Sequence, residues 1–216
     1  MCLTLIEAIT LVWAWNTESL GNNKAACRFV TSYVRDYKLP SAQDYDHPSL
    51  HDGVRLLAFS ELLTKAEEFV VAYEFAHVVL RHIQNAPQNA FPTPVGDVHL
   101  VAKNWEQELS ADALALVLVL PDRPDKVSLK QGCAAPFIAF GVAYLVEKAF
   151  EILKPSERPN NDTHPPAMHR LAALKAALSK MGLAAASDLG QKFLVFVQDC
   201  ATLLEMEQRG VVVDDQ

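Results

Sequence analysis

The chain has few cysteines and no concentrated positive charge. Its four cysteines are scattered along 216 residues, without C-x-x-C spacing or the density of a disulfide framework. This usage is typical of a reduced, cytoplasmic protein. No Lys/Arg-rich run occurs, and the formal net charge is -7. Because phosphate contacts need clustered cations, we expect no nucleic-acid partner.

Long apolar runs and low-complexity linkers are missing as well. The two most apolar internal stretches, residues 113–120 and 133–146, are shorter than the ~20 residues that cross a bilayer. The apolar stretch of residues 1–15 has no basic segment and contains Glu7, which does not fit a secretory signal. We therefore do not expect a membrane span. Half of the residues are hydrophobic, so we expect one folded domain over residues 1–216.

Apolar residues recur at helical spacing through most of the chain. The pattern predicts helices over residues 3–15, 23–37, 60–83, 105–120, 136–153, 166–181 and 189–208. Residues 54–59 fit either a strand or the start of a helix. The predicted fold is mainly α, with at most a small β element. We expect a core over residues 54–181, with N-terminal helices in residues 1–38 and a C-terminal helix over residues 187–208 packed on it.

The most informative segment is FVVAYEFAHVVL, residues 69–80. Glu74 and His77 lie three residues apart, on one face of a helix that is otherwise mostly apolar. A carboxylate is rarely buried without a partner, so these side chains should meet a polar group, a metal ion or a water-filled cleft. His82 follows five residues after His77, and on a continuous helix it should point away from that face.

A second helix repeats this pattern. In WEQELSADALALVLVL, residues 105–120, Glu108 and Asp112 stand four residues apart on one face. If the two faces meet, Glu74, His77 and these two acids converge in one cluster, which is the arrangement we expect. Such residue types bind a borderline divalent metal. A buried network of His and carboxylates that only holds the helices together would use the same residues.

YEFAH is similar to the H-E-x-x-H helix of zincins, and WEQELSAD resembles the downstream E-x-x-x-D helix of the gluzincin type. The resemblance implies a zincin-like helical metallopeptidase scaffold. In that scaffold Glu74 corresponds to the general base that activates the metal-bound water. His77 and Glu108 correspond to zinc ligands. Asp112 corresponds to the carboxylate that orients a ligand imidazole.

Tyr73 stands where this pattern has its first zinc-binding histidine. A phenol with an ordinary pKa near ~10 is a poor ligand at neutral pH compared with imidazole. Catalytic zinc normally has three protein ligands and an open position for water, so His77 and Glu108 alone would hold it weakly. We therefore expect zinc to be weakly bound or absent. Tyr73 itself becomes a ligand only if the metal removes its proton.

A third similarity lies in THPPAMHRLAAL, residues 163–174, which resembles the His-Pro motif and Arg-bearing helix that follow many gluzincin sites. It implies that His164 lies near the cleft and stabilises an oxyanion. It also implies that Arg170 braces its helix through a carboxylate. The same residues would equally suit a plain helix start, with Pro165 and Pro166 in the first turn and Thr163 or His164 near the cap.

Two functions stay open at this point. In a pseudo-peptidase the pocket is kept as a network, Tyr73 donates its hydroxyl to Glu108 or Asp112, and the protein binds a protein or peptide partner. In an active zinc peptidase the residues have the roles given above. A di-iron carboxylate protein would share the E-x-x-H element of Glu74 and His77, but it needs a second copy that the sequence lacks.

Overall fold

The structure is a computed structural model. It describes residues 3–15, 20–36, 53–82, 88–93, 96–101, 105–122, 125–157 and 164–210. The predicted helix ends at residues 37 and 83 lie outside these ranges, as do Met1, Cys2 and Thr163.

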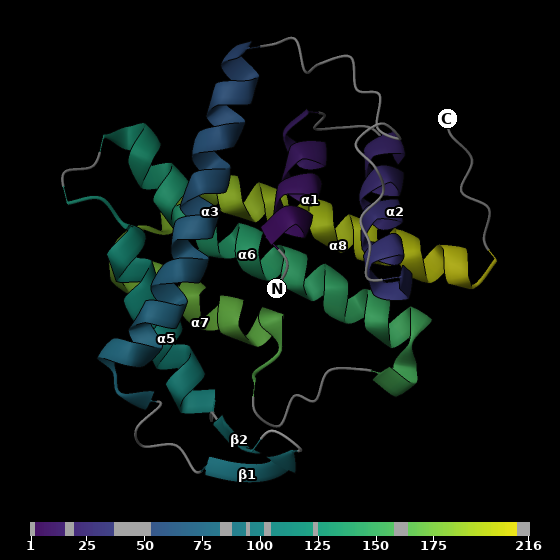
Figure 1. Cartoon of the computed structure of the whole chain (residues 1–216). Coiled ribbons are helices and arrows are strands. Elements are labelled where there is room, and N and C mark those ends of the chain that lie inside the picture. Colours follow the sequence, from purple (N-terminus) through teal and green to yellow (C-terminus); the bar gives the residue numbers. More distant parts are fainter. Residues whose placement is uncertain are drawn as a thin grey trace.

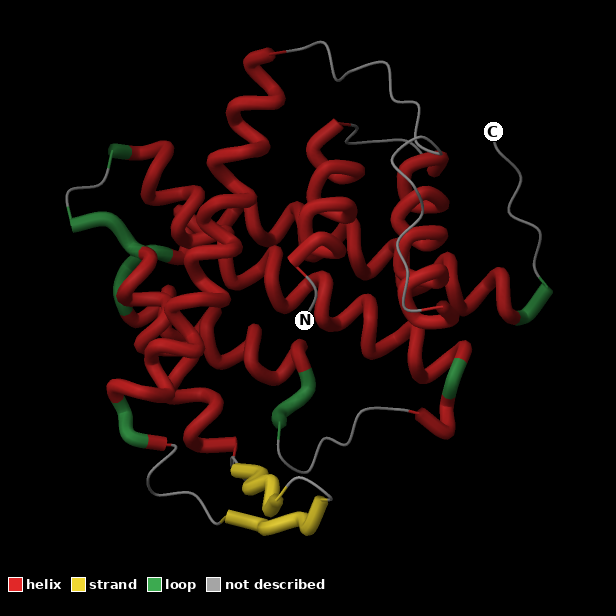
Figure 2. The backbone as a smooth tube through the Cα atoms, viewed as in Figure 1, coloured by secondary structure: helices red, strands yellow, loops and turns green. Residues whose placement is uncertain are grey.

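Helices make up most of the described chain. They are α1 (Leu3–Trp15), α2 (Leu20–Asp36), α3 (Gly53–Val79), α5 (Trp105–Val119), α6 (Lys126–Leu153), α7 (Ala167–Lys180) and α8 (Asp188–Gln208), with 3-10 turns η3 (Pro155–Glu157) and η4 (Ala184–Ser187). Two strands, β1 (Gln88–Thr93) and β2 (Gly96–Val101), pair antiparallel. Figure 2 shows this small sheet at one edge of the helices. The prediction of a mainly α fold with a small β element is confirmed.

The longest helix, α6, starts at Lys126, ten residues before the predicted start at residue 136. Pro136, which was expected to begin the helix, lies inside it. Asp125 sets the true start. Its carboxylate accepts hydrogen bonds from the backbone N–H groups of Val127 at 2.7 Å and Ser128 at 2.9 Å, which satisfies donors at the first turn. Residues 54–59, left open between strand and helix, belong to α3.

The hydrophobic core is one continuous cluster around α6, which runs through the middle of the molecule in Figure 1. Its closest partner is α8. A Cβ on Gly190 of α8 would lie 2.6 Å from Cγ of Phe137 on α6, so glycine permits this approach. By length and composition α6 could also cross a membrane, but 67% of its most apolar window is buried inside the protein. It is the central helix of the core.

Three helices meet beside this core and carry the residues predicted for the site. α3 packs against α5 and α6, and α7 also packs against α5 and α6. The ring of Phe69 on α3 meets the ring of Phe140 on α6 edge to face, with centres 5.7 Å apart. At the start of α7, the backbone N–H of Ala167 donates to Glu147 of α6 at 3.0 Å. These contacts fix the polar faces of α3, α5 and α7 relative to one another.

The C-terminal end of α3 differs from the predicted continuous helix over residues 60–83. The helix ends at Val79, and Arg81 has a positive φ of 55°. This left-handed conformation is uncommon for residues other than glycine and reverses the direction of the chain. His82 is consequently buried next to α3 instead of continuing along it.

Candidate functional site

Glu108 on α5 is the centre of a buried polar network, and its side chain is 0% exposed. Tyr73 on α3 donates its hydroxyl to Oε2 of Glu108. The same oxygen lies 3.2 Å from Nδ1 of His164, just before α7, and 3.5 Å from Nη1 of Arg170 on α7. One carboxylate oxygen thus connects three separate parts of the chain. Burial acts to raise the pKa of Glu108, but the hydrogen bond from Tyr73 and the charge of Arg170 bring it below its ordinary value.

Asp112, one turn after Glu108, forms a two-pronged pair with Arg170. The Nε and Nη2 atoms of the guanidinium donate to the two carboxylate oxygens at 2.8 and 2.6 Å. The guanidinium carbon lies 4.6 Å from the ring centre of Tyr73 and 4.4 Å from that of Phe140, distances typical of cation–π contacts. Burial raises the pKa of Asp112 even though Arg170 favours its charged form. The resemblance implied that Asp112 orients a zinc-binding imidazole. In the structure its hydrogen-bonding partner is instead the guanidinium of Arg170 on α7.

His77 is buried beside Glu108, with a side chain 1% exposed. Its Nε2 lies 3.6 Å from Oε1 of Glu108, and its Nδ1 lies 2.8 Å from Nδ1 of His82. The Nε2 atom of His82 is 3.4 Å from Oγ of Ser110. Sequence reasoning missed His82 because it assumed a continuous helix. No glycine or proline near Arg81 signals the reversal that brings the second imidazole back.

Glu74 does not join the network. Its side chain is exposed, and within the part of the chain whose side chains are described it makes no hydrogen bond or ion pair. The expected convergence of four residues is therefore found for His77, Glu108 and Asp112 only. Helical geometry explains the difference. Successive residues of a helix are turned by about 100°, so when Tyr73 and His77 face the buried network, Glu74 points toward its solvent-exposed edge.

His164 and Arg170 both reach Glu108, so the segment before α7 and the helix itself lie at the network. His164 is partly open to solvent, with a side chain 53% exposed. The simpler interpretation, a plain helix start at the two prolines, describes the same segment: Pro166 is at the cap position of α7, and Ala167 is its first residue. Thr163 lies outside the described residues.

This geometry can be compared with known protein families. The family model of Peptidase U49 matches residues 24–191, which include every residue of the network. The chain belongs to the Peptidase U49 family. Comparisons with curated proteins and with solved structures found no match. Membership of Peptidase U49 confirms the peptidase-like character that the resemblance of residues 73–77 and 105–112 to peptidase motifs implied.

The residues of this Peptidase U49 chain meet the requirements of a catalytic zinc only in part. Two ligand atoms on one tetrahedral zinc stand about 3.4 Å apart, and Nε2 of His77 and Oε1 of Glu108 are separated by 3.6 Å. The remaining ligand position, the first in the pattern, holds Tyr73, whose hydroxyl is donated to Glu108 and whose pKa is raised by burial. Among the described side chains, no three His, Cys, Asp or Glu residues form a metal-binding group. Within the described residues the site therefore lacks one ligand and does not fit a catalytic zinc.

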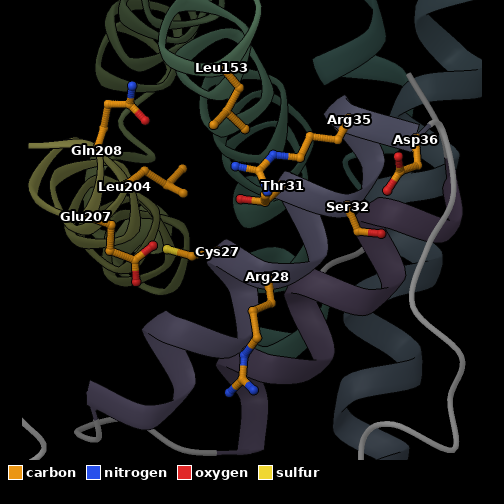
Figure 3. Close-up of a pocket in the computed structure, with 10 residues that line it drawn as sticks. All are labelled: Cys27, Arg28, Thr31, Ser32, Arg35, Asp36, Leu153, Leu204, Glu207 and Gln208. Carbon is orange, nitrogen blue, oxygen red and sulfur yellow. The ribbon is translucent and has the colours of Figure 1, made fainter. Parts of the chain in front are cut away.

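A cavity of about 400 Å³ lies elsewhere in this Peptidase U49 chain, between α2 and the C-terminal ends of α6 and α8 (Figure 3). It is lined by Cys27, Arg28, Thr31, Ser32, Arg35, Asp36, Leu153, Leu204, Glu207 and Gln208. None of these residues belongs to the network around Glu108. Both arginines that line the cavity are exposed, so it is a surface feature separate from the predicted site.

Proposed function

We propose that this Peptidase U49 protein is a pseudo-peptidase, in which the positions of a gluzincin-type zinc site hold a metal-free network. In this proposal the protein acts by binding a protein or peptide, and it does not cleave peptide bonds. The observation that carries the proposal is the hydrogen bond from Tyr73 to Glu108. Tyr73, at the position of the first expected zinc ligand, is thereby hydrogen-bonded to Glu108, the third expected ligand.

The electrostatics of Tyr73 support this proposal. Burial raises the pKa of its phenol, and the neighbouring Glu108 and Asp112 carboxylates act in the same direction, against the opposing charge of Arg170. The phenol thus stays protonated at neutral pH and acts as a hydrogen-bond donor. A metal would need the phenolate and would also have to compete with Tyr73 and Arg170 for the carboxylate of Glu108.

The outer face of α3 supports the binding part of the proposal. Val71, Phe75 and Val78 are 64%, 55% and 58% exposed, and their spacing of four and three residues puts them on one side of the helix. Exposed apolar side chains gathered in this way are typical of binding surfaces. The exposed carboxylate of Glu74 lies among them. This face suits a peptide or helix that carries apolar side chains together with a Lys or Arg.

An active zinc peptidase is the second candidate. The 3.6 Å spacing of Nε2 of His77 and Oε1 of Glu108 favours it, because this is close to the spacing of two zinc ligands. In that case Glu74, at the open rim, would be the general base. The two candidates differ in what replacing Glu74 does to cleavage: an active peptidase would lose its general base, whereas a protein that only binds has no cleavage to lose.

Cleavage of a mixed peptide library with added zinc tests the proposal. We expect the natural chain and Glu74→Gln to show the same background cleavage, because no water is activated at the site. The matched control is Glu68→Gln, an exposed acid on the same helix. Zinc-dependent cleavage by the natural chain that a chelator stops and that Glu74→Gln abolishes, with Glu68→Gln unaffected, would establish the second candidate instead.

A further inference from the structure

Two buried cysteines meet where α2 packs against α8. Cys27 of α2 is 2% exposed, and Cys200 of α8 is 0% exposed. The thiol of Cys27 donates a hydrogen bond to the carbonyl oxygen of Cys200, with the sulfur and the oxygen 3.3 Å apart. Both cysteines are free thiols. The fold thus brings together two thiols that are 173 positions apart in the sequence.

The cavity between α2, α6 and α8 reaches one of these two thiols. Cys27 lines it, and so does Leu204, which follows Cys200 by one turn of α8. Cys200 is not among the described residues that line the cavity. Figure 3 shows the sulfur of Cys27 pointing from α2 toward α8. A small molecule that enters this cavity of about 400 Å³ therefore meets Cys27 before Cys200.

The chemistry of Cys200 favours the same order of reaction. The hydrogen bond with the thiol of Cys27, together with burial, raises the pKa of Cys200. This bond means that the two sulfurs lie close to each other, in addition to the contact with the carbonyl oxygen. Because the thiolate is the reactive form of cysteine, a thiol with a raised pKa is a poor first nucleophile at neutral pH. Cys200 is thus suited to react second, with a partner already beside it.

We propose that Cys27 is a site of oxidation by a small hydroperoxide, and that Cys200 converts the oxidised sulfur to a disulfide between α2 and α8. First, the thiolate of Cys27 attacks the peroxide: an S–O bond forms, the O–O bond breaks, and the departing oxygen takes up a proton. Cys27 is then a sulfenic acid. Next, the sulfur of Cys200 attacks that of Cys27, so that an S–S bond forms and the S–O bond breaks. The hydroxide that leaves takes the proton of Cys200. With hydrogen peroxide, two thiols are oxidised to one disulfide and the peroxide is reduced to two waters.

This disulfide joins the N-terminal helices covalently to the C-terminal helix. α2 packs against α1, α6 and α8, so the new bond fixes α2 to the core at the edge of the cavity. Cys200 lies outside residues 24–191, which match Peptidase U49, and family membership therefore assigns the pair no role. Neither cysteine belongs to the network around Glu108. The oxidation of Cys27 is thus independent of whether the protein cleaves peptides.

Oxidation of the natural chain tests the proposal without any substitution. The reduced protein is treated with hydrogen peroxide, its remaining thiols are blocked under denaturing conditions, and it is digested without reductant for mass spectrometry. We expect a linked pair of peptides that contain Cys27 and Cys200 and that separate on reduction. Cys133 on α6 is the internal control, since it is equally buried and burial raises its pKa to about 11; it should be recovered as a blocked thiol. Unlinked Cys27 and Cys200, under conditions that oxidise a cysteine peptide in the same sample, would overturn the proposal.

Single substitutions test the order of the two steps. In Cys200→Ser the second thiol is missing, so Cys27 should remain a sulfenic acid that dimedone traps as a stable adduct. In Cys27→Ser, Cys200 should give no such adduct, because it does not line the cavity. Cys133→Ser, the matched control, should form the same disulfide as the natural chain. A dimedone adduct on Cys200 in Cys27→Ser, with none on Cys27 in Cys200→Ser, would contradict the assignment of Cys27 as the oxidised site.

Resistance to urea provides a second readout, which shows whether the disulfide fits the folded chain. A bond between positions so far apart restricts the unfolded chain strongly, so the urea midpoint of the oxidised natural chain should lie above that of the reduced chain. Cys133→Ser should keep this shift, and Cys27→Ser should abolish it. An oxidised chain that unfolds at the same or a lower urea concentration would mean that the bond distorts the fold, which would contradict its origin in the native contact of the two thiols.

Discussion

The interface of α6 with α8 and the interface of α3 with α5 and α7 are both buried, yet they are held together by different physics. Between α6 and α8 the contacts are apolar and close, as Gly190 against Phe137 shows. Between α3, α5 and α7 the centre is polar, and Glu108, Asp112 and Arg170 depend on one another. Apolar packing is spread over many atoms, whereas the polar interface depends on a few individual bonds.

Removing one partner of the buried ion pair should have the largest effect. Arg170→Met keeps much of the side-chain volume but leaves the carboxylate of Asp112 without its guanidinium. We expect a loss of about 3–5 kcal/mol in the free energy of unfolding, measured by urea denaturation. Arg209→Met is the control, since the guanidinium of Arg209 is exposed and lies 3.9 Å from the carboxylate of Glu205 at the surface. Equal stability of these two variants would contradict the dominance of the buried pair.

The apolar interface between α6 and α8 should be destabilised most by a larger side chain at its closest contact. In Gly190→Ala the new Cβ would lie 2.6 Å from Cγ of Phe137, so the ring or the helix must move. Overpacking of this kind costs about 1–3 kcal/mol, and thermal or urea denaturation would measure it. Gly182→Ala tests a different effect, because nothing lies near that Cβ and only its positive φ of 74° opposes the change. A fully neutral Gly190→Ala would show that the two helices are less closely packed.

Loss of a single hydrogen bond to a buried charge should come next. Tyr73→Phe removes the hydroxyl that Glu108 accepts and changes little else in shape. We expect a loss of about 1–3 kcal/mol in unfolding free energy. Tyr144→Phe on α6, a partly buried tyrosine outside the network, provides the comparison. Stability of Tyr73→Phe equal to that of the natural chain would mean that the bond contributes nothing to folding.

The stability difference between the natural chain and Tyr73→Phe should depend on pH. The pKa of Glu108 lies below its ordinary value of 4.5, against the effect of burial, chiefly because of the hydrogen bond from Tyr73. A depressed carboxyl pKa stabilises the folded state above the unfolded pKa, and this stability is lost as the pH falls through the folded pKa. The stability gap between the natural chain and Tyr73→Phe should therefore narrow as the pH falls below about 4.5. A gap that is constant from pH 6 to pH 3 would contradict this assignment.

The smallest effect is expected for Glu74→Gln. A carboxylate buried against His77 or Tyr73 would make this change destabilising, but the side chain is exposed and lies outside the network. We expect an unchanged melting temperature, because exposed substitutions rarely change stability by more than ~0.5 kcal/mol. A clear drop in melting temperature would mean that Glu74 has a buried partner after all.

The helices and most of the site could be predicted from the sequence because both depend on periodicity. Polar residues on apolar helix faces identified His77, Glu108 and Asp112 as neighbours in space. The misplaced start of α6 had a different origin: proline was expected to begin the helix, whereas the cap formed by Asp125 does so. A proline inside a helix is tolerated when packing on both sides outweighs one missing hydrogen bond.

The pairing within the site could not be predicted from the sequence. The angle between α5 and α7 determines which carboxylate pairs with Arg170, and helical periodicity carries no information about that angle. The placement of His82 depends on one backbone conformation at Arg81. Arginine has no particular preference for that conformation, so the residue itself gives no sign of it.

The reversal at Arg81 makes the connection between His77 and His82 sensitive above all to its length. Leu80 and Arg81 bond back to α3 through their backbone N–H groups, at 2.9 Å to Ala76 and 3.1 Å to Val78, and backbone bonds of this kind do not depend on the identity of the side chain. Many substitutions at the exposed Leu80 should thus be accepted, whereas the positive φ of 55° at Arg81 favours glycine and disfavours β-branched residues. Inserting or deleting one residue there would shift His82 out of reach of His77, while α3 and α5 could keep their full length.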